Sequence, residues 1–207
     1  MEQQSQEWFE ARLGKVTASR IVDVVAKTKS GYSASRANYM AQLVVERITN
    51  TPAESYSNTA MQWGTDHEPM ARAEYELLRG QIVDTVGFVP HPTIVNAGAS
   101  PDGLVGDKGL IEIKCPNTAT HIDTLLTRKI PEKYLFQMLW QMTCTGRDWC
   151  DFVSYDPRMP ESLRLCVINV PFDAEQVNML ESEIKLFLAE VDTKVEQLLK
   201  LTGAIDV

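Results

Sequence analysis

The sequence predicts an α/β fold in which a mixed central β-sheet is flanked by helices. Three observations lead to this prediction. Apolar residues recur at helical spacing near both ends of the 207-residue chain, and short runs rich in Val and Ile lie between them. The turn residues 106–109 separate two of these runs and predict a hairpin. The length fits one domain over 1–207, with helices over 5–79, a sheet region over about 81–170 and a C-terminal helix over about 173–201.

The N-terminal segment is expected to begin with three helices. The first spans 5–13 and ends at Gly14. Thr17 is a suitable N-cap for the second, because its side-chain oxygen can accept a hydrogen bond from a backbone N–H. The third helix is marked by apolar residues at helical spacing, namely Tyr39, Leu43 and Ile48.

A loop and an interrupted helix are expected next. Residues 50–58 are polar and contain a proline, which predicts a loop. Residues 58–79 have helical character, but Gly64 and Pro69 predict a break. Proline removes a helix hydrogen bond and its ring clashes with the preceding turn, so an uninterrupted helix is not expected there.

Further strands surround the hairpin. Alternating or apolar runs predict them over 81–89, 93–95, 149–155 and 162–170. The segment 131–144 is expected to be helical. Gln137 and Gln141 are four residues apart in it, so they lie on one face of that helix.

The C-terminal segment predicts a long amphipathic helix. Asp173 followed three residues later by Gln176 resembles a capping box. The apolar residues beyond it follow one stripe, formed by Val177, Leu180, Ile184, Phe187, Val191, Val195 and Leu198. We expect this stripe to pack on the core, although a seam between subunits is an alternative.

Three functional side chains are expected to meet at the hairpin. Side chains alternate along a strand, so Glu112 and Lys114 share one face and the intervening Ile113 points to the core. If the hairpin closes in the matching register, Asp102 lies beside Glu112. An ordinary surface hairpin with a Glu/Lys pair is the alternative.

This set of residues is suited to metal-assisted phosphodiester hydrolysis. Mg²⁺ prefers oxygen ligands, which the Asp102 and Glu112 carboxylates and the Ile113 backbone carbonyl can supply. A bound metal lowers the pKa of coordinated water, and Lys114 can offset charge on the phosphate. Lys114 beside two carboxylates is expected to stay protonated, which argues against a role as a free base.

The charge balance argues against a general nucleic-acid binder, because the net charge is −8. The distribution is uneven, however. Residues 12–36 contain six basic residues and one acid, whereas residues 172–207 contain eight acids and three lysines. A basic surface facing DNA and an acidic outer surface would explain this pattern; two solvated faces are the alternative.

Composition also indicates the cellular compartment. Four cysteines form no C-x-x-C pair, which predicts free thiols in a reducing cytoplasm and no structural zinc. No run approaches the roughly 20 apolar residues that span a membrane, and no secretory signal is recognised, so a cytoplasmic protein without membrane partners is expected.

Five short blocks, in order, resemble the bacteriophage lambda exonuclease family. Pro101-Asp102 followed by Glu112-Ile113-Lys114 is similar to the PD-(D/E)xK nuclease pattern. The other matching blocks are Trp8–Ser19, Trp63–Glu68, the full Ser100–Gly103 and Tyr155–Met159. The resemblance implies a restriction-endonuclease-like core.

The resemblance also implies an activity and partners. It predicts a Mg²⁺-dependent exonuclease, with Mn²⁺ as a substitute, that digests one strand of double-stranded DNA from 5′-phosphorylated ends. The 3′ single-stranded products would serve recombination by strand annealing. Members of this family form a homotrimeric ring and hand the exposed strand to a single-strand DNA annealing protein.

The resemblance assigns roles to individual residues. The metal ligands correspond to Asp102 and Glu112, the catalytic lysine to Lys114, and a helix glutamate near the metal to Glu68. The residues that match a site for the terminal 5′-phosphate are Arg12, Ser19, Ser100 and Gln137. Lys29 aligns with an arginine that enters the DNA groove, and a lysine there cannot make the same bidentate contact. Met61 aligns with an apolar residue that wedges the duplex end apart.

Two alternatives to an exonuclease remain. A structure-specific endonuclease of the same fold would use the same three residues, although a pocket for a DNA end would then have no purpose. A non-catalytic subunit that binds a partner through its acidic C-terminal helix is the second, and the intact Asp102, Glu112 and Lys114 argue against it.

Overall fold

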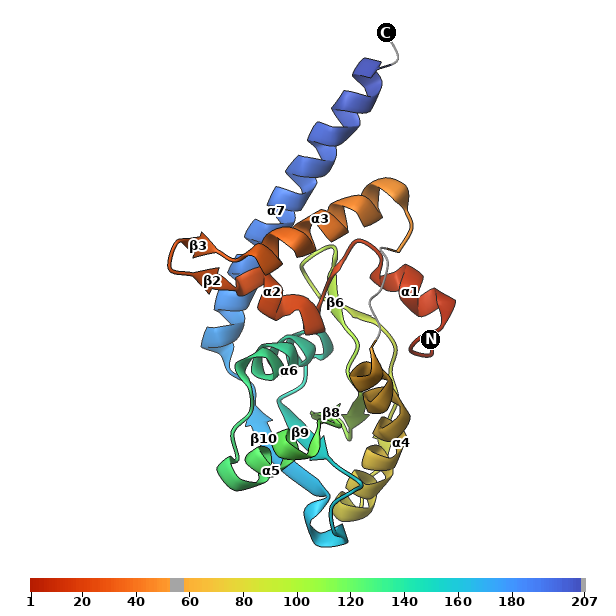
Figure 1. Cartoon of the computed structure of the whole chain (residues 1–207). Coiled ribbons are helices and arrows are strands. Elements are labelled where there is room, and N and C mark those ends of the chain that lie inside the picture. The colour runs from red at the N-terminus through yellow and green to blue at the C-terminus, as the bar shows by residue number, and fades with distance from the viewer. Residues whose placement is uncertain (53–57, 206–207) are drawn as a thin grey trace.

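The computed structural model describes residues 1–52 and 58–205, with side chains as far as Leu201. The loop expected over 50–58 therefore lies partly outside the described residues. The described chain folds as α/β, with a mixed five-stranded sheet between helices, as the sequence predicts (Figure 1).

The five-stranded sheet has a mixed strand order. Its strands, in spatial order, are β10 (Leu165–Pro171), β9 (Trp149–Tyr155), β8 (Gly109–Lys114), β7 (Gly103–Val105) and β4 (Val83–Asp84). Strands β8 and β9 are parallel, and the other neighbours are antiparallel. β7 and β8 form the expected hairpin, with Gly103 opposite Ile111.

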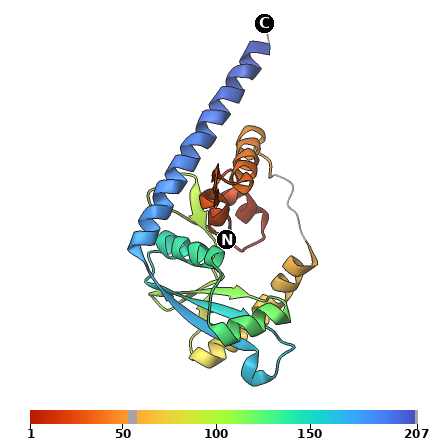
Figure 2. The same ribbon diagram turned by 60° about the vertical axis from the view of Figure 1, so that its left-hand side comes forward.

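Two helices cover opposite faces of this sheet, as the two views in Figures 1 and 2 show. Helix α4 (Thr59–Arg79) buries Ala71 and Tyr75 against one face, where it meets Ile111 and Ile113. Helix α6 (Glu132–Thr145) packs against the other face, with Leu110 in the same core. The alternation expected for β8 is therefore confirmed: its isoleucines point away from the Glu112 face.

Smaller elements complete the sheet region. A second sheet joins β1 (Val16–Thr17), β6 (Ala97–Ala99) and β5 (Val89–Pro90), and a separate hairpin pairs β2 (Lys27–Thr28) with β3 (Gly31–Tyr32). The 3-10 turns are η1 (Ala18–Arg20) and η2 (Glu161–Leu163). Helix α5 (Thr118–Thr127) packs on β9.

The remaining helices gather around the C-terminal one. They are α1 (Gln6–Arg12), α2 (Ile21–Val25), α3 (Ala34–Thr49) and α7 (Ala174–Ile205). Helix α7 packs against α2, α3 and α6, and its C-terminal half extends away from the rest of the chain (Figure 2). Its apolar stripe is buried from Val177 to Val191 and half-buried at Val195, whereas Leu198 is exposed. The stripe therefore packs on the core over most of its length.

Several predicted elements are confirmed. The first helix, the helix ending near Cys144 and the strand over 149–155 lie where the sequence places them. Ser5 caps the first helix by accepting a hydrogen bond from the Trp8 N–H. All four cysteines are free thiols, and three of them are buried. Among the described residues, no helix is long and apolar enough to cross a membrane.

The break predicted within the helical region 58–79 is wrong. Helix α4 runs through both Gly64 and Pro69 without interruption. Asn58 caps its start by accepting a hydrogen bond from the Met61 N–H, and Gly80 ends it in the left-handed conformation. One missing backbone hydrogen bond is tolerated because both ends are capped and the helix packs on the sheet.

Other boundaries also need correction. The single strand expected over 81–89 is two strands in different sheets, and 93–95 is a turn preceding β6. Helix α5 was not predicted, although Asn117 caps it. Thr17 precedes a 3-10 turn and makes no side-chain cap, and Ile48 on α3 is exposed. These segments depend on long-range contacts more than on local pattern.

The close packing of Gly109 on Trp149 allows a test of the sheet. A Cβ atom at Gly109 would lie 2.1 Å from the Trp149 ring, so Gly109→Ala forces the ring or strand to move. We expect the free energy of unfolding to fall by about 1–3 kcal/mol in urea denaturation. Gly64→Ala is the control, because nothing lies within 4 Å of a Cβ there and alanine favours a helix interior. An unchanged stability of Gly109→Ala would contradict this account.

Candidate active site

Asp102 lies at the point where β7 begins, beside the centre of the sheet. Its Oδ2 accepts a hydrogen bond from the Ile113 N–H at 2.6 Å. The paired register Gly103–Ile111, continued by two residues, places Pro101 opposite Ile113. The N–H and the carbonyl of Ile113 point to the same side of the strand, toward Pro101. Proline has no N–H, so it cannot donate a hydrogen bond to that carbonyl. The Pro-Asp pair thus ends the ladder between β7 and β8 and brings a carboxylate beside the Ile113 backbone.

Glu112 is fully buried and its carboxylate accepts three hydrogen bonds. Lys114 Nζ and Gln137 Nε2 both donate to Oε1, the latter at 2.6 Å. Gln141 Nε2 donates to Oε2 at 2.6 Å. Both glutamines come from α6, whose i,i+4 spacing aims them at the same carboxylate. A buried carboxylate requires such donors, because an unpaired charge in the interior is costly.

The electrostatics of the cluster follow from its burial. Loss of solvent raises the pKa of Asp102 well above its usual value, and the charge of Glu112 adds to this. Burial alone would lower the pKa of Lys114, but the charges of Glu112 and Asp102 outweigh it and raise that pKa. Lys114 is therefore protonated, as expected from the sequence.

Glu68 reaches the same region from α4. Its Oε1 accepts a hydrogen bond from Arg72 Nη2 at 2.6 Å, and the same nitrogen lies 3.2 Å from the Asp102 carbonyl oxygen. Burial raises the pKa of Glu68 above its usual value, and the opposing Arg72 and Lys114 charges offset this only in part. Within the described part of the chain, no three His, Cys, Asp or Glu side chains are arranged as a metal site. The ligand set predicted from the sequence uses only two carboxylates, together with a backbone carbonyl.

A second group of predicted residues meets at α1. The Ser100 hydroxyl accepts hydrogen bonds from Trp8 Nε1 at 2.9 Å and from Arg12 Nη1 at 3.3 Å. The Arg12 guanidinium stacks on the Trp8 ring, 3.9 Å from its centroid, and burial lowers its pKa. Among the described residues, no carboxylate lies within 4.0 Å of this guanidinium. A desolvated cation of this kind is suited to an anionic ligand.

The other predicted residues lie on different elements. Ser19 is exposed on η1, which packs against α6, the helix that carries Gln137. Gln137 itself bonds to Glu112 rather than to the Arg12 group. Lys29 is exposed at the turn of the β2–β3 hairpin, and Met61 is exposed in the first turn of α4.

Two of the sequence blocks, Trp63–Glu68 and Tyr155–Met159, contact each other through residues for which no role was predicted. The Trp63 ring stacks on His67 with centroids 3.6 Å apart, and the Arg158 guanidinium lies 4.6 Å from the Trp63 centroid. Asp156 is buried and accepts hydrogen bonds from Arg158 at 2.7 and 3.0 Å. This contact ties the Met61 end of α4 to the end of β9. A single sequence does not show which distant residues contact each other, so this contact could not be predicted.

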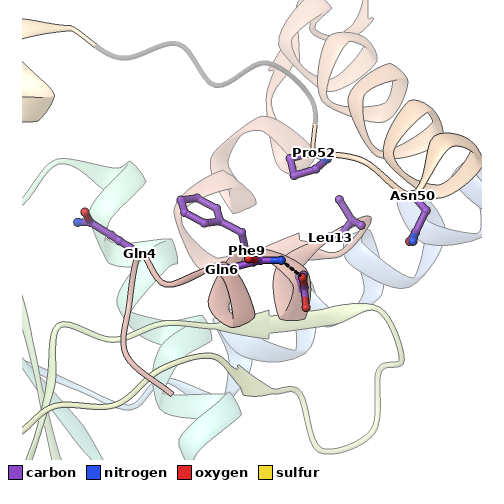
Figure 3. Close-up of a pocket in the computed structure, with 7 residues that line it drawn as sticks. Gln4, Gln6, Phe9, Leu13, Asn50 and Pro52 are labelled. Carbon is purple, nitrogen blue, oxygen red and sulfur yellow. Dashed lines mark hydrogen bonds between the residues drawn. The ribbon is translucent and has the colours of Figure 1, made fainter.

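A hollow of about 690 Å³ lies beside α1 (Figure 3). Its lining includes Phe9, Leu13 and Pro52, together with polar side chains of which Gln6 and Glu10 bond to each other at 2.8 Å. None of the site residues predicted from the sequence lines it. The carboxylate cluster on β8 and this hollow are therefore separate features.

The family of the chain follows from a match to a family model. Residues 7–148 match the YqaJ-like viral recombinase domain. The chain belongs to this family. The match spans the Arg12 group, Glu68 and the Asp102, Glu112 and Lys114 cluster. None of the curated protein sequences matches the chain.

Solved structures agree with this family. A crystal structure of the alkaline exonuclease LHK-Exo from Laribacter hongkongensis, and one of LHK-Exo in complex with dAMP, are each 51% identical with a TM-score of 0.91. Each alignment covers 97% of this chain and 100% of that chain. A phage-related exonuclease from Haemophilus somnus 129PT is 17% identical, with a TM-score of 0.69 and coverage of 91% and 96%, and shows the shared fold. The predicted family, fold class and enzyme class, a nuclease, are confirmed.

The Asp156–Arg158 contact predicts a pH-dependent stability. Burial raises the pKa of Asp156, but hydrogen bonds from Arg158 and Thr118 outweigh burial and lower it to about 2. A depressed carboxylate pKa stabilises the fold above its unfolded value, near 4, and this contribution is lost as the pH falls toward 2. We expect Asp156→Asn to lower the free energy of unfolding by about 2 kcal/mol at pH 7 and by much less near pH 2.

Urea denaturation at the two pH values measures this difference. Asp123→Asn is the matched control, because Asp123 is exposed on α5 and a surface change of this kind is expected to have little effect. An equal loss for Asp156→Asn at both pH values would contradict the assigned ion pair.

Proposed function

We propose that this chain is a Mg²⁺-dependent 5′-to-3′ exodeoxyribonuclease acting on linear double-stranded DNA. The observation that carries this proposal is the meeting of Asp102, at the start of β7, with Glu112 and Lys114 of the central strand β8 in a member of the YqaJ-like family. LHK-Exo, at 51% identity, supports exonuclease action. The products would be 3′ single-stranded overhangs for recombination by strand annealing.

The donor set fits a hard divalent cation. Asp102 and Glu112 offer carboxylate oxygens, and Pro101 leaves the Ile113 carbonyl without an N–H partner from its side. Burial, and after it the charge of Glu112, raise the pKa of Asp102, and a bound cation would favour the ionised form of both carboxylates. When bound there, Mg²⁺, or Mn²⁺ in its place, would lower the pKa of a coordinated water and offset charge on the phosphate.

The chain's own residues would position the reacting groups. Gln137 and Gln141 orient Glu112 through its two oxygens, and the Ile113 N–H orients Asp102. Lys114 is held protonated beside them, where its charge can stabilise the negative phosphate as the phosphodiester bond breaks. Glu68 adds a further carboxylate near Asp102, and Arg72 orients it.

The Arg12 group supports recognition of a terminal 5′-phosphate. Its guanidinium is stacked on Trp8, bonded to Ser100 and without an acidic partner among the described residues. Guanidinium binds phosphate with two parallel hydrogen bonds, so this group is suited to a phosphorylated end. Ser19 and Gln137 are proposed to complete the site.

The remaining assignments concern the duplex and partners. Lys29 on its hairpin is proposed to enter the DNA groove, where its charge can reach the backbone phosphates, and exposed Met61 at the start of α4 to separate the terminal base pair. We propose a homotrimeric ring and delivery of the product strand to a single-strand DNA annealing protein.

Asp102→Ala is expected to abolish DNA digestion. Loss of one carboxylate ligand removes several kcal/mol of transition-state stabilisation, so the rate should fall about a thousandfold or more. The assay uses linear duplex DNA with Mg²⁺, and a chelator should stop the wild type. Asp107→Ala, in the exposed turn of the same hairpin, is the control and should retain activity. Full activity of Asp102→Ala would refute the assignment, and cutting of a covalently closed circle would favour the endonuclease alternative.

Arg12→Ala is expected to remove the preference for phosphorylated ends. Charge-assisted hydrogen bonds to phosphate contribute about 1.5–3 kcal/mol, so the ratio of digestion rates for 5′-phosphate and 5′-hydroxyl ends should fall by about tenfold or more. Arg12→Lys keeps the charge but loses the paired geometry, so its ratio should be intermediate. A ratio equal to that of the wild type in both variants would exclude Arg12 from this role.

A further inference from the structure

The β2–β3 hairpin is too small to be stable alone. Each strand contains two residues, and the hairpin makes no sheet contact beyond its own pair in the described chain. Isolated two-stranded hairpins are marginal in water even when longer. Its position beside α7, which Figure 1 shows, must therefore come from side-chain contacts.

Glu183 of α7 binds both strands of this hairpin. Its Oε1 accepts a hydrogen bond from Lys27 Nζ at 2.6 Å, and its Oε2 accepts one from the Tyr32 hydroxyl at 2.7 Å. Its side chain is 19% exposed, whereas that of Lys27 is 57% exposed. One carboxylate thus joins the first residue of β2 to the last residue of β3.

A second contact fixes the ring of Tyr32. The Arg36 guanidinium lies 3.8 Å from the Tyr32 centroid and bonds to both oxygens of Glu190 at 2.8 Å. Arg36 Nε also donates to the Val24 carbonyl at 3.1 Å, and its side chain is only 5% exposed. Bidentate contacts of this kind hold a fixed geometry. Glu183 and this buried arginine together clamp the hairpin to α7 and α3.

We propose that Glu183 is a positioning residue for DNA binding, which holds the hairpin so that Lys29 at its turn faces the DNA backbone. This inference rests on the proposed function. Lys27 is bound to Glu183, and Lys29 makes no ion pair among the described residues, so its charge is available to a phosphate. The acidic helix α7 thereby takes part in DNA binding without touching DNA.

Simple electrostatics gives the opposite expectation. The net charge is −8, so removing an acidic residue near a DNA-binding surface should reduce repulsion and tighten binding. If Glu183 positions Lys29, removing it should weaken binding despite the more favourable charge. The sign of the effect therefore separates a positioning role from a general charge effect.

The experiment measures the affinity of the full-length protein for a fluorescent duplex by anisotropy, without divalent metal and over a range of salt concentrations. We expect Glu183→Ala and Lys29→Ala each to raise Kd about three- to tenfold, and the double variant to bind no worse than either single one. The slope of log Kd against log salt should fall by about one phosphate contact in all three. The rate at saturating DNA should be the same for Glu183→Ala and the wild type.

Glu196→Ala is the matched control. It removes the same charge from the same helix, and the exposed Glu196 side chain makes no hydrogen bond or ion pair within the described residues. Its Kd should be unchanged or lower. Hydrogen exchange should rise across residues 26–33 in Glu183→Ala while the Tm stays near that of the wild type.

Several outcomes would overturn the inference. They are tighter or unchanged binding by Glu183→Ala, a Kd change in the double variant equal to the product of the two single changes, or an unaltered Kd for Lys29→Ala. If Glu183→Ala fails to fold, Tyr32→Phe removes one of the same hydrogen bonds and must raise Kd in the same direction. Absence of DNA digestion by the wild type would refute the proposed function, a result distinct from this pattern of affinities.

Discussion

The structure depends on keeping the charge of Glu112 in the protein interior. Its side chain is fully buried on a central strand, where an unpaired carboxylate would be strongly destabilising. Three donors satisfy it, from Lys114 on its own strand and from Gln137 and Gln141 on α6. This requirement sets how α6 lies on the sheet, because both glutamines must reach one carboxylate. The packing of the core and the chemistry of the site therefore share one constraint.

The position of α6 determines the surroundings of the cluster. η1 and α2 pack on the same helix, so the N-terminal segment lies beside the helix that carries Gln137 and Gln141. On the other face, α4 packs through Ala71 and Tyr75, which brings Glu68 and Arg72 to the Asp102 backbone. The candidate phosphate-binding residues and the candidate metal ligands thus come from segments that are distant in sequence. Helices α6 and α4, which support them, pack on the two faces of the same sheet.

Local sequence pattern was sufficient for part of the central site. Alternation placed Glu112 on the face opposite the isoleucines, whereas the register that brings Asp102 beside it was left open by the sequence and is seen in the structure. The same reasoning failed where tertiary contacts decide: α4 passes through Pro69, and α5 went unrecognised. The two α6 glutamines were placed on one face, but their shared partner on β8 was not predictable, because it depends on packing between distant elements. The contact of Arg158 with Trp63 was missed for the same reason.

The acidic character of the chain is consistent with a DNA-binding role once the partners of the acids are considered. On α7, Glu183, Glu190 and Asp192 each bind a cationic side chain from the N-terminal segment. These acids thus form ion pairs with the basic N-terminal elements and fix the side chains of Lys27, Arg36 and Arg47. Their field is partly cancelled within the pairs, and screening at physiological salt limits its range to about 8 Å. Net charge alone therefore overstates the repulsion of a polyanion, because these acids are paired within the chain while Lys29 makes no ion pair among the described residues.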